Sequence, residues 1–345
     1  MKSRHFLQLG ACFIILSILE SCGCAGDCPV GWQPHAFSPV FYGHRDYDHI
    51  ATDPASPPVQ CRVFYPTVDG SPPDAPLLEG CCKYPLIILI HGNCQGDEAN
   101  HYKKWFLLPA QLARSGYVVL VPSVPSISSI PDPAHPAIAV METLRTWILN
   151  DWEFHELVHP NTGVIGHSFG APIGASFSKA NSNVKAFASL SGQYEGVNDY
   201  LTMNKPILFM RGHPTSDIAE AFVGFNWAGT PQPKHRAEFP EGFHWDYMLA
   251  AQVQCTNSFG RGDCAKAPQM TTELIMMFFT RYLRRGTLAN TSVPLSLIPP
   301  DITLTTEQQF FAGGNYLQAF DGAGSECSVN LTWETPEGSG TITEP

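Results

Sequence analysis

The stretch Gly163-Val164-Ile165-Gly166-His167-Ser168-Phe169-Gly170 places a serine between two glycines, directly after a short apolar run. Because small residues follow it from Ala171 to Ser176, the segment is typical of a β-strand, a very tight turn and a helix. Such a turn holds its central residue in strained backbone geometry and tolerates only small neighbours. It pushes the hydroxyl of Ser168 into the open at a helix N-terminus, where backbone N–H groups stabilise a developing oxyanion. The pattern predicts a serine nucleophile.

The surrounding chain alternates strand-like and helix-like segments. The strand-like segments are residues 60–65, 84–90, 117–121, 184–190, 206–210 and 236–239, and the helix-like segments are residues 99–115, 137–152 and 271–285. Fully apolar runs such as residues 84–90 suit parallel strands that are covered on both faces. This alternation predicts an α/β fold with one doubly wound, mostly parallel sheet.

The two ends of the chain differ in character from this middle part. The N-terminus carries the basic residues Lys2, Arg4 and His5. An apolar run, residues 6–19, follows, and then small residues and cysteines at 21–28, which is the pattern of a secretory signal peptide. We therefore divide the chain into a signal peptide (1–26), a catalytic domain (27–286) and a short C-terminal extension (287–345). The extension is rich in Thr, Ser, Pro and Gly, and its composition fits either a small β appendage or a partly disordered tail.

Charge and hydropathy restrict the partners. The chain has 20 basic and 31 acidic residues, a net charge of −11, which argues against nucleic acid or an anionic membrane surface. Beyond the N-terminal region no segment reaches the ~18 apolar residues of a membrane span. We expect a secreted or extracytoplasmic monomer without a transmembrane segment.

The 11 cysteines support an oxidising compartment. Cleavage after Gly26 leaves an even set, which allows up to four disulfides: Cys28, Cys61, Cys81, Cys82, Cys94, Cys255, Cys264 and Cys327. Cys255 and Cys264 bracket a Gly-rich loop and are the pair that we expect first. The alternative is a lipid anchor at Cys22, but Glu20 fits a lipobox poorly and lipidation leaves an odd number of other cysteines.

A serine nucleophile needs a histidine base and an acid that orients it. In a fold of this kind the chain order is serine, acid, histidine. His244 lies in a Gly-containing loop after the strand-like residues 236–239, and Asp217 lies in the loop after residues 206–210. We predict Ser168, Asp217 and His244 as the catalytic triad, with Glu195 and Asp199, which follow the preceding strand, as alternative acids.

The oxyanion formed on attack needs two N–H donors. The backbone of Phe169, directly after the nucleophile, is one, and the backbone of Asn93, in the loop after residues 84–90, is the other. We interpret His91 as structural because it precedes that turn. His167 either lines the cleft or packs beneath it. Aromatic cleft walls for the substrate are offered by Tyr194, Trp227 and Trp245, although each is equally consistent with ordinary packing.

These elements together resemble the α/β-hydrolase family over about residues 35–286. Residues 62–66, 84–92 and 112–119 are most similar to the branch of dienelactone hydrolases, bacterial cutinases with PET hydrolases, and platelet-activating-factor acetylhydrolases. The resemblance implies a secreted esterase without cofactor or metal, whose substrate is a small ester, a lipid or a polyester. One departure is Asn93, which stands where polyester hydrolases carry an aromatic residue.

Two other functions compete with this interpretation. His155-Glu156-Leu157-Val158-His159 matches H-E-x-x-H, which on a helix binds zinc in metalloproteases. Pro160 follows the motif directly, and Lys179 stands where a third, acidic ligand is expected. The second alternative is a non-catalytic binding protein with a hydrolase fold, but such chains usually lose the serine or the histidine.

Overall fold

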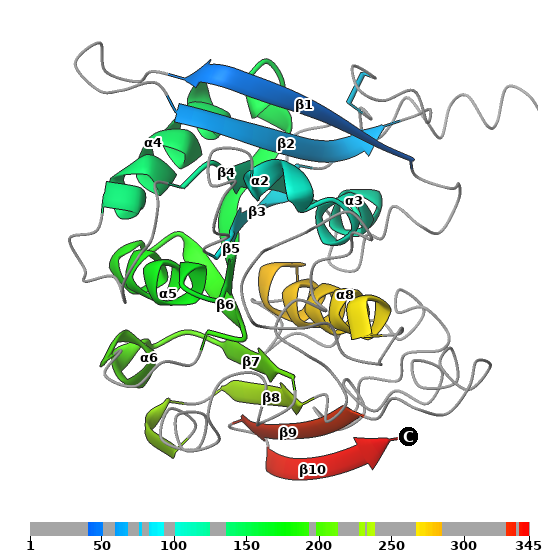
Figure 1. Cartoon of the computed structure of the whole chain (residues 1–345), viewed down its shortest axis with the longest axis vertical. Helices are drawn as coiled ribbons and strands as arrows, with labels where there is room; N and C mark the ends of the chain where they lie inside the picture. The colour runs from blue at the N-terminus through cyan, green and yellow to red at the C-terminus, as the bar shows by residue number, and fades with distance from the viewer. Residues whose placement is uncertain are drawn as a thin grey trace, which may run out of the picture.

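The computed structural model describes residues 41–50, 59–67, 76–77, 83–92, 101–124, 136–192, 198–212, 228–231, 233–238, 267–284, 329–335 and 338–344. Within these residues the strands form one ten-stranded sheet in the order β1-β2-β4-β3-β5-β6-β7-β8-β9-β10 (Figure 1). β4 lies between β2 and β3, and from β5 to β10 the strands follow one another in sequence order.

The six central strands are parallel, and the pairs at both edges are antiparallel. The parallel strands are β4 (Val118–Pro122), β3 (Tyr84–Ile90), β5 (Val158–His167), β6 (Val184–Leu190), β7 (Ile207–Arg211) and β8 (Lys234–Glu238). The edges are β1 (Phe41–Ile50) with β2 (Val59–Thr67), and β9 (Val329–Thr335) with β10 (Gly338–Glu344). The predicted α/β class with a mostly parallel sheet is confirmed.

Helices cover both faces, as a doubly wound sheet requires (Figure 1). On one face lie α4 (Pro136–Asn150), α5 (Gly170–Ala180) and α6 (Asn198–Thr202). On the other lie α2 (His101–Lys104), α3 (Leu107–Arg114) and α8 (Ala267–Phe279), which continues into a π-helical turn, Thr280–Arg284. In β3, Leu86, Ile88 and Ile90 pack toward α4 and α5, and Ile87 and Leu89 pack toward α3 and α8. This two-sided burial explains why the strand is apolar at almost every position.

Two elements differ from the sequence-based expectation. The edge strand β1 was not predicted, because its sequence FYGHRDYDHI has no continuous apolar run and most of its side chains remain partly exposed. The predicted helix 99–115 is interrupted at Trp105 and Phe106, between α2 and α3. At this break Trp105 is buried, while the ring of Phe106 contacts Tyr42 on β1. Tertiary packing thus overrides the helical pattern.

Cys61 on β2 corrects the expected disulfide set. It is a free thiol, fully buried against the face covered by α4, and burial raises the pKa of the thiol well above its usual value. The prediction that Cys61 belongs to the paired cysteines is wrong. Removing Cys61 from the count also cancels the parity argument against a lipid anchor at Cys22. Residues 1–26 and the pair Cys255 and Cys264 lie outside the described residues.

The predicted C-terminal extension contributes a hairpin to the main sheet. β9 pairs antiparallel with β8, and β10 pairs with β9. The buried Lys234 on β8 reaches the Glu334 carboxylate on β9 at 3.1 Å. The domain boundaries at residues 26 and 286 stay predictions. Among the described helices, none is long and apolar enough to span a membrane.

Candidate active site

Ser168 stands at the end of β5, directly before α5, in a backbone conformation that L-residues rarely adopt. Its φ angle is +52°, in the left-handed region that costs a non-glycine residue free energy. Two backbone hydrogen bonds hold it there. The Ser168 N–H donates to the Leu190 carbonyl on β6 at 2.9 Å, and the Ala171 N–H donates to the Ser168 carbonyl at 2.9 Å. The predicted strand, turn and helix are therefore present, and their geometry is that of a nucleophile elbow.

The glycines on both sides of Ser168 are required by close backbone contacts. A methyl group at Gly166 would lie 2.5 Å from the Ala171 Cα. A methyl group at Gly170 would lie 2.5 Å from the carbonyl oxygens of both Ile90 and His91. Side chains at either position would therefore push α5 away from β3 or unwind the turn. The GxSxG spacing is explained by this packing.

The loop after β3 reaches Ser168. A methyl group at Gly92 would lie 2.5 Å from the Cβ of Ser168, so the Gly92 backbone lies close to this side chain. Ser168 keeps only 5% of its surface exposed. Most of the Ser168 residue is therefore packed against its neighbours, and the open presentation of its hydroxyl stays a prediction. Asn93, the predicted second oxyanion donor, follows Gly92 directly but lies outside the described residues.

His91 anchors this loop. Its Nε2 accepts a hydrogen bond from the Val124 N–H at 3.1 Å, so in the neutral ring Nδ1 carries the proton and donates to the Gly92 carbonyl at 2.8 Å. Burial lowers the pKa of His91 to about 4, which keeps the imidazole neutral. The ring therefore ties the end of β3 to the residues after β4. This geometry agrees with the structural interpretation of His91.

His167 lies beneath the elbow. It is fully buried, and its ring meets Trp105 edge to face with centroids 5.2 Å apart. Of the two alternatives left open by the sequence, this position favours packing over contact with a substrate. Trp105 reaches His167 because the helix is interrupted between α2 and α3.

Residues 191–192, which follow β6, pack against the elbow. They were not predicted from the sequence. Ser191 has a φ angle of +46°, and its N–H donates to the Met210 carbonyl on β7 at 2.8 Å. A methyl group at Gly192 would lie 2.1 Å from the Ala171 Cβ and 2.8 Å from the Ser168 carbonyl oxygen. The hydroxyl of Tyr200 on α6 donates to the Gly192 carbonyl at 2.6 Å. The one sequence signal was a Ser-Gly pair directly after an apolar strand.

Of the other predicted site residues, Phe169 is described and is the N-cap of α5. Asp217, His244, Tyr194, Trp227, Trp245 and Glu195 lie outside the described residues, so their positions stay predictions. The loops that carry Asp217 and His244 nevertheless begin side by side, since β7 and β8 are parallel neighbours. At their carboxyl ends the buried Arg211 donates from Nε to the Glu238 carboxylate at 2.8 Å.

Asp199, one of the alternative acids, is used elsewhere. Its carboxylate accepts hydrogen bonds from the Ser176 hydroxyl and, at 2.8 Å, from the Lys179 ammonium group. Ser176 lies six residues into α5, roughly 9 Å along the helix from Gly170. Asp199 therefore ties α6 to the middle of α5 and does not face the nucleophile.

The H-E-x-x-H residues do not share a helical face. His155–Leu157 is a short 3-10 helix, whereas His159 already belongs to β5. The His155 Nδ1 lies 2.8 Å from the Trp152 carbonyl oxygen, and the His159 Nδ1 accepts a hydrogen bond from the Asn161 N–H. The zinc-binding geometry of this motif requires an α-helix through both histidines, so the metalloprotease alternative is contradicted.

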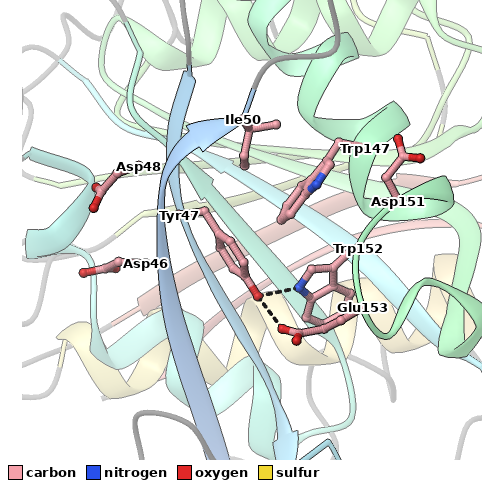
Figure 2. Close-up of a pocket in the computed structure, with 8 residues that line it drawn as sticks. All are labelled: Asp46, Tyr47, Asp48, Ile50, Trp147, Asp151, Trp152 and Glu153. Atoms are coloured by element: carbon pink, nitrogen blue, oxygen red, sulfur yellow. Dashed lines mark hydrogen bonds between the residues drawn. The ribbon is translucent and has the colours of Figure 1, made fainter.

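A cavity of about 570 Å³ opens between β1 and the end of α4 (Figure 2). Its residues are Asp46, Tyr47, Asp48, Ile50, Trp147, Asp151, Trp152 and Glu153. The Trp152 indole N–H donates to the Tyr47 hydroxyl at 2.7 Å, and that hydroxyl donates to the Glu153 carboxylate at 2.8 Å.

Arg45 also binds the Glu153 carboxylate, so these polar groups are committed to one another. Glu153 precedes the start of β5, whereas Ser168 follows its end, and ten strand residues span ~30 Å. We therefore interpret the cavity as part of a structural seam and not as the catalytic cleft.

Comparisons with known proteins agree with the fold. No protein-family model and no curated protein matches the chain. A solved structure of a ferulic acid esterase from Streptomyces cinnamoneus matches with a TM-score of 0.55 and 18% sequence identity, covering 81% of this chain and 96% of that one. At this identity the likeness concerns the fold, and the chain has an α/β-hydrolase fold.

Proposed function

We propose that the protein is a secreted serine hydrolase that cleaves carboxylic esters through an acyl-enzyme. The observation that carries this proposal is the backbone of Ser168, held at a φ of +52° between the end of β5 and the start of α5, with Gly92 against its Cβ. Strain of this kind is kept where the surrounding structure demands it, and here it puts a hydroxyl at a helix N-terminus.

In the proposed mechanism Ser168 attacks the ester carbonyl while His244 takes the hydroxyl proton. Asp217 orients the imidazole and stabilises the imidazolium that forms. The N–H groups of Phe169 and Asn93 stabilise the oxyanion, His244 returns the proton to the leaving alcohol, and water then releases the acid by the same steps. No cofactor takes part in these steps.

The substrate class rests on two likenesses. The resemblance to cutinases and acetylhydrolases points to small esters, lipids or polyesters, and the ferulic acid esterase with the same fold adds esters of aromatic acids. Methyl ferulate therefore belongs in a panel with short and long p-nitrophenyl esters, an oxidised phospholipid and a polyester film.

The predicted signal peptide at residues 1–26 supports secretion. Sequencing the N-terminus of the exported protein tests this prediction.

Substitution of the nucleophile tests the mechanism. We expect Ser168→Ala to lower kcat for p-nitrophenyl acetate by at least ~10⁴-fold, because the remaining groups cannot form the acyl-enzyme. A fluorophosphonate should add one mass label to the wild-type chain, on the peptide that contains Ser168, and none to the variant. Ser176→Ala, which removes another serine hydroxyl of α5 from its contact with Asp199, serves as the control and should keep its activity.

Three results would reject the proposal. Ester hydrolysis that survives in Ser168→Ala would exclude this serine as nucleophile. Loss of activity after metal chelation, with recovery on adding zinc, would return the metalloprotease alternative despite the geometry of residues 155–159. Binding of esters without turnover in the wild-type chain would favour the non-catalytic alternative.

A further inference from the structure

We propose that Tyr200 and Gly192 are positioning residues that fix the direction of the Phe169 N–H, one of the two oxyanion donors. The inference rests on the proposed function and extends it to residues that touch neither the substrate nor the nucleophile's side chain. It follows from how one peptide group of the elbow is held.

The Ser168 carbonyl and the Phe169 N–H belong to the same peptide unit. That unit is planar and trans, so its oxygen and its N–H point in opposite directions. Whatever holds the Ser168 oxygen therefore also aims the Phe169 N–H. A donor that stabilises an oxyanion has to be aimed before the reaction, because reorientation during the reaction costs free energy.

Gly192 holds this oxygen by contact. The position that a methyl group would take on Gly192 is 2.8 Å from the Ser168 oxygen and 2.1 Å from the Ala171 Cβ. The α-carbon of Gly192 therefore lies close to the elbow. The Ser168 N–H also donates to the Leu190 carbonyl at 2.9 Å, which joins the same two segments. With Ala171 N–H on the same oxygen, the peptide unit is held on its carbonyl side.

Tyr200 holds Gly192 in turn. Its hydroxyl donates to the Gly192 carbonyl at 2.6 Å, a short distance for such a bond. The tyrosine ring is fully buried, packed on Phe187 of β6 and Phe209 of β7. The anchor is therefore rigid. The preceding residue, Ser191, has a φ of +46°, so the segment that Tyr200 fixes is itself strained and would relax without the bond.

The first test removes only the hydroxyl. Tyr200→Phe keeps the ring and should lower kcat for p-nitrophenyl acetate by ~10-fold, part of the 10²–10³-fold cost of losing an oxyanion donor altogether, with KM unchanged. Its affinity for phenylboronic acid, which forms a tetrahedral adduct with a serine, should fall by the same factor. Tyr117→Phe is the matched control, because it removes another buried hydroxyl, bonded to Thr280, at the opposite end of the parallel strands.

The second test moves the peptide unit. Gly192→Ala alone meets Ala171 and is expected to fold poorly. Combined with Ala171→Gly, it loses that clash and retains the contact with the Ser168 oxygen, with the Ser189 hydroxyl further away at 3.3 Å. The double variant should fold and lose ~100-fold in kcat, whereas Ala171→Gly alone should lose little.

The outcomes separate the inference from the function on which it rests. If Ser168→Ala abolishes hydrolysis but Tyr200→Phe behaves like Tyr117→Phe in kcat and in boronate affinity, the positioning role is wrong and the esterase stands. An equal loss of melting temperature in both tyrosine variants, with a kcat loss in Tyr200→Phe alone, supports the role. Hydrolysis that survives in Ser168→Ala overturns both.

Discussion

The elbow around Ser168 and the seam between β1 and α4 both join segments that are distant in the sequence, but they use different kinds of contact. At the elbow, glycine backbones lie against backbone and Cβ atoms, and a methyl group has no room at Gly92, Gly170 or Gly192. At the seam, side chains bridge the gap, since Tyr47 and Arg45 on β1 bind Glu153, and a cavity of about 570 Å³ remains.

The contacts at the elbow fix the geometry of Ser168, whereas the contacts at the seam hold two elements together. Backbone contacts fix the position of Ser168 closely, because a peptide unit has few soft dihedral angles. Long side chains tolerate small shifts, so the seam contributes stability without fixing a geometry. We therefore expect changes at the elbow to affect catalysis and changes at the seam to affect unfolding alone.

The largest effect should come from a single methyl group at the elbow. In Gly170→Ala the new Cβ would lie 2.5 Å from two backbone oxygens that cannot yield. We expect a loss of about 3 kcal/mol in unfolding free energy, and at least ~100-fold in kcat because α5 must shift. Denaturant unfolding and ester hydrolysis measure the two.

Gly229→Ala is the matched control for this variant. Its Cβ would lie 2.6 Å from the tip of the Leu201 side chain, which can rotate away. If both variants lose equal activity, the contrast between rigid and yielding neighbours is wrong.

The sequence predicted the elbow well because its signal is local. The GxSxG spacing, the apolar β3 and β6 and the small residues of α5 each follow from what their own backbone needs, and the structure has β3 and β6 at the predicted bounds. The His91-Gly92 turn was placed for the same reason, since it directly follows a recognisable strand.

The seam could not be predicted, because each of its contacts joins residues that are far apart in the sequence. Tyr47 meets Trp152 and Glu153 more than a hundred residues later, and β1 shows no apolar period. The burial of Cys61 depends on the same edge, and so does the interruption before α3, where Phe106 packs on Tyr42. Tyr200 was missed although only eight residues separate it from Gly192, because no local sequence pattern marks a hydroxyl that bonds to a backbone carbonyl.

The second largest effect should come from lowering the pH, which reduces the unfolding free energy through His91 beside the elbow. The folded-state pKa of His91, about 4, lies below the unfolded value of 6.5, so between these values the unfolded chain binds a proton that the folded chain does not. Stability from this group is therefore lost as the pH falls. The loss should reach about 2 kcal/mol at pH 5 and cease to grow below pH 4.

The measurement is the unfolding free energy of wild type and His91→Gln between pH 7 and 4. His235, whose pKa burial also lowers, contributes in the same direction in both proteins and cancels in the difference. A His91→Gln protein with the same pH slope as wild type would show that this imidazole is not held neutral.

The smallest effect should come from the seam, where Trp152→Phe keeps a ring against Tyr65 and Phe154 but removes the N–H that donates to the Tyr47 hydroxyl. A buried acceptor that loses its donor costs about 1 to 2 kcal/mol. We expect the unfolding free energy to fall by that amount while kcat and KM for p-nitrophenyl acetate stay unchanged, since the length of β5 lies between the seam and Ser168. Trp147→Phe, which alters an edge contact with the Tyr47 ring, should lower the unfolding free energy less. A kcat that falls in Trp152→Phe without loss of stability would mean that the seam transmits strain to the elbow. The elbow would then not be independent of the seam in this molecule.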